Sequence, residues 1–176
     1  MACNTISSYS FPCRTNQGGI AKVYIGYYDP ATPEVATIGT TGGSASTISG
    51  WVSGTVSHYA VAQRVEQGSF TQKFTGDIAT GTTMYEGTVE ITVEQVDATL
   101  TNWINVLGQG VWRLLILDNL GNYYYVGYKN GCYVTDIAGG PGKAFSDGNK
   151  AVITFSSKEP VGAYLVTSTA ATAIIA

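Results

Sequence analysis

The stretch Trp112–Thr135, WRLLILDNLGNYYYVGYKNGCYVT, decides the predicted fold. It holds three runs of aliphatic and aromatic residues, separated by two short polar segments, Asn119–Asn122 and Asn130–Gly131. Asn-Gly between two such runs indicates a β-hairpin, because both residues accept the positive φ angles of a type I′ turn. The stretch therefore predicts antiparallel β-sheet, and it carries none of the usual residue patterns of a catalytic site.

Further strands are predicted on both sides of this stretch, at Ile20–Tyr28, Glu34–Ile38, Val52–Glu66, Ser69–Asp77, Tyr85–Val96 and Ala151–Ser156, with a last short run that ends at Val166. The clearest alternation is in Tyr85–Val96. Period-two alternation indicates one buried and one solvated face. One face of that strand carries Glu86, Thr88, Glu90, Thr92 and Glu94, and the other carries Val89, Ile91 and Val93. In Ser69–Asp77 the two faces carry Thr71, Lys73, Thr75 and Asp77, and Phe70 and Phe74.

One α-helix is predicted, at Asp97–Leu107. Asp97 suits the N-cap position, and Leu100, Trp103, Ile104 and Leu107 recur at helical spacing as one apolar stripe. The fold class is therefore mainly β, an antiparallel β-sandwich or partly closed barrel with one flanking helix at about residues 97–107. We expect an N-terminal arm at 1–19, a single β domain at 20–167 with irregular loops at 40–50 and 136–148, and a C-terminal tail at 168–176.

Charged residues make up only 12% of the 176 residues, about half of the ~25% usual in soluble domains. Two interpretations fit: a Thr/Ser-rich soluble β protein, or a chain whose surface is covered by neighbouring copies. We favour the second, because interface cores are depleted in charge. The net charge is −3, and the nine Lys and Arg residues are scattered along the chain. They therefore form no positively charged surface for binding phosphates. A neutral or acidic path along which nucleic acid slides without binding remains compatible.

The chain is expected to carry neither a signal peptide nor a membrane span. The first residues lack the basic start and apolar core of a signal peptide, and no apolar run approaches the ~20 residues of a membrane span. The tail STAATAIIA at 168–176 is expected to be disordered or to pack as an arm on an adjacent subunit. Three cysteines without paired spacing fit reduced thiols in a cytosol, and a single histidine makes metal binding improbable.

No enzyme activity, cofactor or metal is predicted. His58 lacks a nucleophile signature nearby, and the evenly spaced Glu86, Glu90 and Glu94 are typical of a solvated or lumen-facing row rather than of a glycosidase pair. The segment Gly139–Lys143 lacks the spacing of a phosphate-binding loop. A small hydrolase is therefore disfavoured.

An alternative of another class is a carbohydrate-binding module. Aromatic residues available for a sugar-binding face are Trp51, Trp103, Trp112 and Tyr123–Tyr125. Trp103 already belongs to the helix stripe, and the consecutive tyrosines should point to both sides of a sheet, so at most part of the set can form a platform.

Two long segments carry a family resemblance. They are GQGVWRLLILDNLGNYYYVGYKNGCYVTD, from Gly108, and GKAFSDGNKAVITFSSKEPVGAYLV, from Gly142. With the SKEP motif at Ser157–Pro160 and the "C…GGI" pattern that ends at Ile20, they resemble structural proteins of tailed bacteriophages. The similarity is greatest to tail tube and related tail or connector ring subunits of phages of Bacteroidetes hosts, and it covers the last half of the chain and, loosely, the N-terminal arm.

The resemblance implies a β-sandwich or barrel protomer with a flanking helix. Six copies would form a ring, and stacked rings would form a tube through which DNA passes without specific binding. Strands from each copy would join into a continuous inner barrel, with Val56–Glu66, Ser69–Asp77 and Tyr85–Val96 as candidates. Glu86, Glu90 and Glu94, with Thr88 and Thr92, would face the channel, and Lys73 and Arg64 would partly neutralise its wall.

Further expectations follow from the same resemblance. The loop 40–50 and both arms would lock one ring to the next. The chain would be made in the host bacterial cytoplasm and reside in the virion tail, with itself and other tail or connector proteins as partners and without membrane contact. The low charge also leaves open a connector, stopper or capsid-associated role in the same virion.

Overall fold

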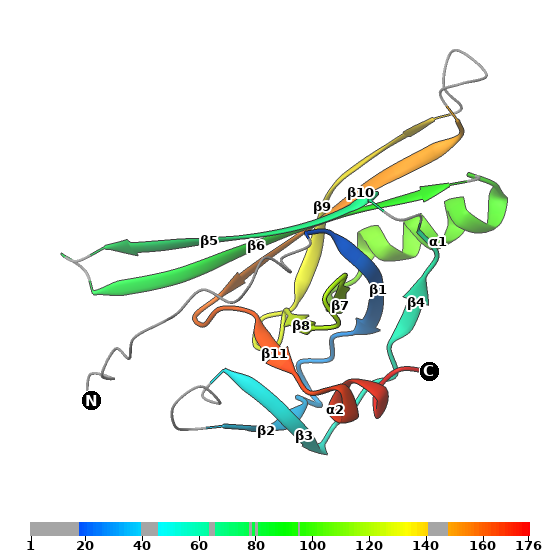
Figure 1. The fold of residues 1–176 in the computed structure, drawn as a ribbon. Helices are drawn as coiled ribbons and strands as arrows, with labels where there is room; N and C mark the ends of the chain where they lie inside the picture. The colour runs from blue at the N-terminus through cyan, green and yellow to red at the C-terminus, as the bar shows by residue number, and fades with distance from the viewer. Residues whose placement is uncertain are drawn as a thin grey trace.

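The computed structural model describes residues 18–39, 46–63, 66–77, 79, 81–94, 96–140 and 148–176. The described chain is mainly β, as predicted, and it has two helices where one was predicted (Figure 1). Its elements are β1 (Ile20–Tyr27), β2 (Val35–Ile38), β3 (Thr47–Ser53), β4 (Tyr59–Val61), β5 (Gly68–Asp77), β6 (Thr82–Glu94), α1 (Ala98–Gln109), β7 (Trp112–Asp118), β8 (Tyr123–Val126), β9 (Cys132–Gly140), β10 (Lys150–Glu159), β11 (Tyr164–Val166) and α2 (Ser168–Thr172).

All described strands belong to one mixed sheet, which is not closed. Its strand order is β2-β3-β11-β8-β7-β9-β10-β6-β5, with β1 paired to β7 and β4 paired to β1. The pairs are antiparallel except for β3 with β11, which is parallel. The sheet bends back on itself, so that it forms packed layers in the manner of a β-sandwich (Figure 1).

Two hydrophobic cores lie on opposite faces of the central strands β1, β7 and β8. Leu114 and Ile116 of β7 belong to the first core, which β6, β10 and α1 cover, whereas Leu115 belongs to the second, which β3, β11 and α2 cover. β1 alternates in the same way, with Val23 in the first core and Tyr24 in the second. Burial on both faces explains why the central strands are nearly continuous apolar runs.

Helix α1 confirms the predicted helix, with ends one or two residues away from those expected. The Asp97 Oδ1 accepts a hydrogen bond from the Leu100 N–H at 2.7 Å and so caps the first turn. Leu107 is buried against the first core, with Leu100, Trp103 and Ile104 packed around it. No helix in the described ranges is both long and apolar enough to cross a membrane.

The first predicted turn of the deciding stretch is confirmed and the second is wrong. The Asp118 Oδ1 accepts hydrogen bonds from Leu120 N–H at 2.9 Å and Asn122 N–H at 2.7 Å, and this turn joins the antiparallel strands β7 and β8. Asn130–Gly131 does not form a hairpin. Strands β8 and β9 are both antiparallel to β7 and therefore run in the same direction, so the segment between them shifts the chain without reversing it.

Other boundaries also differ from the prediction. The loop expected at 40–50 ends early, because β3 begins at Thr47; residues 40–45 lie outside the described residues, as do 1–17 of the predicted arm. Of the strand expected over Val52–Glu66, the first two residues belong to β3, Tyr59–Val61 form β4, and 64–65 are not described. The loop expected at 136–148 is a strand as far as Gly140, and 141–147 are not described.

The C-terminal tail folds on its own chain. It forms α2, whose residues Ala170 and Ala171 are buried in the second core with Ile174. The Trp51 Nε1–H donates to the carbonyl of Ala170 at 2.8 Å. The expectation of a disordered tail or of an arm on an adjacent subunit is therefore wrong for this structure, because the second core buries the tail's small apolar residues.

Candidate assembly surface

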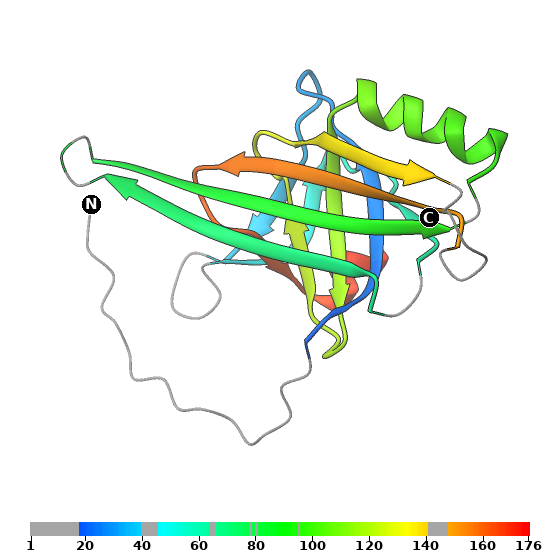
Figure 2. The ribbon, with the colours of Figure 1, turned by 90° about the horizontal axis from the view of Figure 1, so that it is seen from above.

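Strands β9, β10, β6 and β5 form the layer that closes the first core from outside (Figure 2). β6 pairs with β10 from Tyr85 to Glu94 and with β5 from Thr82 to Ile91. The inward side chains of β6 and β10, among them Val89, Ile91 and Phe155, pack on the core. The other face of this layer, which we call the outer face, carries no packed element of the described chain.

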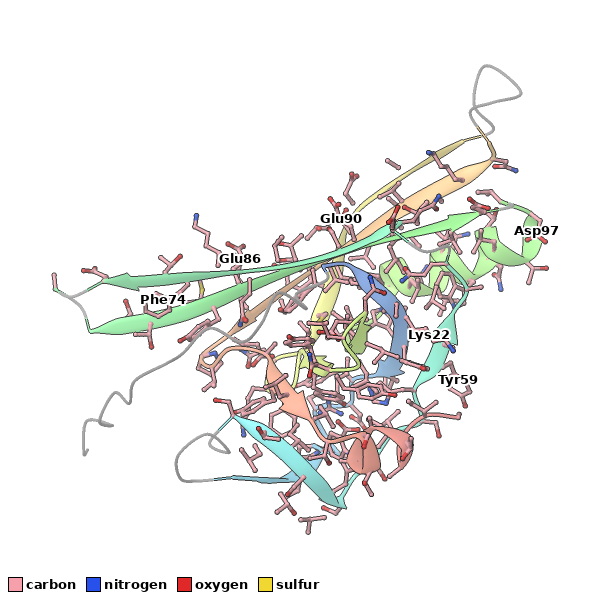
Figure 3. All side chains as sticks on the ribbon, in the orientation of Figure 1. Lys22, Tyr59, Phe74, Glu86, Glu90 and Asp97 are labelled. Atoms are coloured by element: carbon pink, nitrogen blue, oxygen red, sulfur yellow. The ribbon has the colours of Figure 1, made fainter. Side chains whose placement is uncertain are left out.

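The hairpin of β5 and β6 projects well beyond the body of the protein (Figures 1 and 2). From Thr71 to Asp77 every residue of β5 is exposed, on both faces of the ribbon. Phe74 is 55% exposed, with its ring 5.1 Å from that of Tyr85 across the hairpin (Figure 3). This end of the layer thus has an apolar pair but no core of its own chain beneath it.

The β9–β10 hairpin extends toward the opposite end of the layer, near α1 (Figure 1). β9 touches β7 at one register position, Trp112 opposite Cys132, and afterwards pairs with β10. Thr135–Gly139 are exposed along β9, and the apolar Ile137 is 38% exposed. The layer therefore reaches past the body at both ends.

The outer face is polar, and Ser and Thr dominate it. The register places on it Ser69, Thr71, Lys73, Thr75 and Asp77 of β5; Thr82, Met84, Glu86, Thr88, Glu90, Thr92 and Glu94 of β6; Lys150, Val152, Thr154, Ser156 and Lys158 of β10; and Tyr133, Asp136 and Ala138 of β9. The predicted faces of β5 and β6 are thus confirmed. These described residues include five carboxylates and three lysines, so the face is weakly acidic.

The row of glutamates interleaves with lysines. Glu86 lies opposite Lys73 on one side and Lys158 on the other, where Lys158 Nζ is 3.9 Å from Glu86 Oε1. Glu94 lies opposite Lys150. Glu90 instead faces hydroxyl groups: the Ser69 Oγ donates to its Oε2 at 3.2 Å, and Thr154 is opposite on β10. Figure 3 shows Glu86 and Glu90 on the side of the layer away from the body.

Both long edges of the layer lack a neighbouring strand among the described residues. β5 pairs with β6 on one side, and β9 beyond Cys132 pairs with β10 on one side. Such edges present backbone donors and acceptors to any added strand. Arg64, expected near the channel wall, lies outside the described residues, and β4 pairs with β1, apart from the layer.

The aromatic residues considered for sugar binding do not come together on one exposed face. Tyr124 packs toward the first core and Tyr123 and Tyr125 toward the second, which confirms that the tyrosines point to both sides. The Trp112 Nε1–H donates to the Leu107 carbonyl at 2.8 Å, and Trp103 packs against the first core.

The residues considered for catalysis are equally separated. His58 is completely buried, and its ring nitrogens face the Val56 carbonyl oxygen and the Tyr125 hydroxyl rather than a nucleophile. Burial raises the pKa of the Cys132 thiol, which keeps that sulfur protonated and unreactive. Gly139 and Gly140 belong to β9, and 141–143 lie outside the described residues. The described residues hold no cluster of three or more metal-ligating side chains.

Sequence reasoning missed one polar cluster, in which Glu34, His58, Arg113 and Tyr125 meet inside the second core. These residues come from four separate parts of the chain, so no local spacing relates them. The one available signal is Arg113, a charge at the start of a strand that is otherwise apolar. Comparisons with protein-family models, curated proteins and solved structures give no match for this chain.

Proposed function

We propose that this protein is a structural subunit of a phage virion, a tail tube protein that assembles into stacked, hexameric rings around a channel for DNA. The observation that carries the proposal is the four-stranded layer, whose two long edges have no neighbouring strand among the described residues and whose ends project beyond its own core. The sequence resemblance to tail tube and tail ring proteins supplies the biological setting.

The strand directions fit a ring of identical copies. Neighbours alternate in direction across β9, β10, β6 and β5, so β9 and β5 are antiparallel to each other. When β5 of one copy lies beside β9 of the next, the new pair is antiparallel like those within each copy. The same contact repeats head to tail from copy to copy. If the rotation between neighbouring copies closes, the copies form a ring. Ten residues of β5 and the segment Tyr133–Gly140 are available to pair.

The outer face suits the wall of a channel. Six copies with four strands each would make a barrel wider than the porins, whose 16–18 strands already enclose water. The Ser and Thr residues of this wall would present hydroxyl groups to the DNA. The small excess of carboxylates would repel its phosphates weakly. Glu90 is the channel-facing candidate least neutralised by neighbours, because lysines lie opposite Glu86 and Glu94. Thr88 and Thr92 line the same strand face.

Electron microscopy and light scattering of the purified protein test the proposal. Stacked rings or tubes support it. Closed rings that do not stack favour the connector or stopper alternative, and a monomer at all concentrations contradicts ring assembly.

A matched pair of proline variants tests the edge itself. Successive residues of a strand direct their N–H groups to opposite edges, so Thr71→Pro and Gln72→Pro differ in which edge they affect. One variant removes an N–H directed at β6 and lowers the melting temperature. The other removes an N–H on the open edge, keeps the melting temperature and abolishes assembly. Normal assembly by both folded variants contradicts the proposed β5–β9 contact.

A further inference from the structure

The backbone of His58 is hydrogen-bonded to the end of the C-terminal segment, which also packs in the second core through Ala170, Ala171 and Ile174. The His58 N–H donates to the Ile174 carbonyl at 2.7 Å, and the His58 carbonyl accepts from the Ala176 N–H at 3.0 Å. The two chain segments form a parallel bridge between His58 and Ile175. Residues 174–176, which we call the C-terminal clasp, are held by these backbone bonds to His58 and by the burial of Ile174.

The His58 ring lies in a closed polar cluster. Its Nδ1 is 2.8 Å from the Val56 carbonyl oxygen, which can only accept a hydrogen bond, so Nδ1 carries a proton. Its Nε2 is 3.2 Å from the Tyr125 hydroxyl, whose proton also has the Glu34 carboxylate as a partner. The ring leaves no space on the side of β1, because a Cβ on Gly26 would lie 2.6 Å from Nε2.

The cluster is balanced in charge when His58 is neutral. The groups that face it are Glu34 from the segment before β2, Arg113 from β7 and the Tyr125 hydroxyl from β8. The Glu34 Oε2 lies 3.4 Å from the Arg113 Nη1, so one negative and one positive charge are already paired. A proton on Nε2 adds a second positive charge at a completely buried site.

We propose that His58 couples the C-terminal clasp to pH: protonation of its ring on acidification releases residues 174–176 from the body. The proton is accepted by Nε2, and the segment around His58 moves to let water reach the imidazolium, which breaks the backbone bonds to Ile174 and Ala176. The inference is independent of the proposed virion role.

The direction of the pH effect follows from burial. Burial lowers the pKa of His58 below its ordinary value of 6.5, and the Arg113 charge acts in the same direction, while the Val56 carbonyl and the Glu34 charge partly oppose it. The clasped state therefore binds this proton less tightly than an open state does. The clasp keeps its full stability above pH 6.5 and loses it as the pH falls from 6.5 toward the lowered pKa.

Hydrogen–deuterium exchange by mass spectrometry on the full chain tests this coupling. His58 is the single histidine, so exchange of its Cε1 proton reports its pKa without ambiguity. After correction for intrinsic rates, protection of a peptide over 164–176 should fall by up to about tenfold for each pH unit between 6.5 and the measured pKa. A peptide over Lys150–Glu159 in the first core should keep its protection and serves as the internal control.

Two variants make the test reciprocal. His58→Gln, which cannot titrate, should show no such pH dependence in the 164–176 peptide. A chain that lacks residues 174–176 should show a His58 pKa closer to 6.5, because coupling between two sites acts equally in both directions. The proposal is overturned if wild-type protection at 164–176 stays constant while His58 titrates, or if the truncation leaves the pKa of His58 unchanged. The wild-type measurement decides even if His58→Gln does not fold.

Discussion

A substitution that removes the Arg113 charge alone should destabilise the fold more than a double substitution that removes the charges of both Arg113 and Glu34. Arg113 is 1% exposed, and Glu34 is its ion-pair partner among the described residues. Its Nε and Nη1 atoms are buried without a hydrogen-bond partner in the part of the chain that the structure describes, while its guanidinium lies 4.6 Å from the centre of the Tyr28 ring. Arg113→Met keeps most of the side-chain volume and leaves the Glu34 carboxylate as an uncompensated buried charge.

The magnitude follows from the geometry. Opposite charges 3.4 Å apart at an effective dielectric constant of about 20 attract by roughly 5 kcal/mol, an attraction largely offset by the cost of taking both from water. Breaking such a pair on one side costs about 3–5 kcal/mol, whereas apolar or neutral replacement of both partners is often nearly neutral. We therefore expect Arg113→Met to cost about 3–5 kcal/mol and the double variant with Glu34→Gln about 1 kcal/mol.

Urea denaturation of dissociated protein, followed by circular dichroism, measures these free energies of unfolding. The exposed pair Lys158–Glu86, at 3.9 Å, provides the matched control, and Lys158→Met should cost less than about 1 kcal/mol. The reasoning is refuted if Arg113→Met costs no more than Lys158→Met. It is also refuted if the double variant costs the sum of the two single changes, because the two charges would then not be coupled.

Three further predictions follow from individual contacts. Replacing Glu86, Glu90 and Glu94 with Lys reverses the charge of the outer face and should slow DNA release from virions; unchanged release would count against the channel assignment. Gly26→Ala places a Cβ 2.6 Å from the His58 Nε2 and should lower the free energy of unfolding in urea by about 1–3 kcal/mol, whereas Gly50→Ala meets no atom within 4 Å and should change it by less than about 0.5 kcal/mol. In a chain with Cys3 and Cys13 changed to Ser, the buried Cys132 thiol should react with a thiol reagent only as urea unfolds the protein, and prompt labelling in native buffer would contradict its burial.

Elements with a strong local pattern were predictable from the sequence. β6 was found because its side chains alternate strictly, and α1 because an N-cap precedes a helical apolar stripe. The outward face of Glu86, Glu90 and Glu94 follows from the same alternation, so the β6 residues of the candidate surface could be named from the sequence, whereas those of β9 and β10 were not.

Elements that depend on distant partners were not predictable. β3 contains Ser49, Gly50 and Ser53 and has a loop-like composition, but β2 and β11 hold it from both sides. α2 is only five residues long and owes its helical state to the second core, since so short a helix is unstable alone. At Asn130–Gly131 the local hairpin signal is overridden because the Glu159 carboxylate accepts hydrogen bonds from the Lys129 and Asn130 N–H groups.

The low charge of the chain is weaker evidence for assembly than the projecting strands are. Two cores bury β1 and β7 on both faces, and this architecture by itself replaces charged positions with apolar ones. The projection of β5 and β6 has no such internal explanation. A two-stranded ribbon without a core is at best marginally stable in water, yet β5 continues for seven exposed residues from Thr71 to Asp77. A neighbouring copy that pairs with β5 and covers Phe74 would supply the contacts that the chain's own body does not.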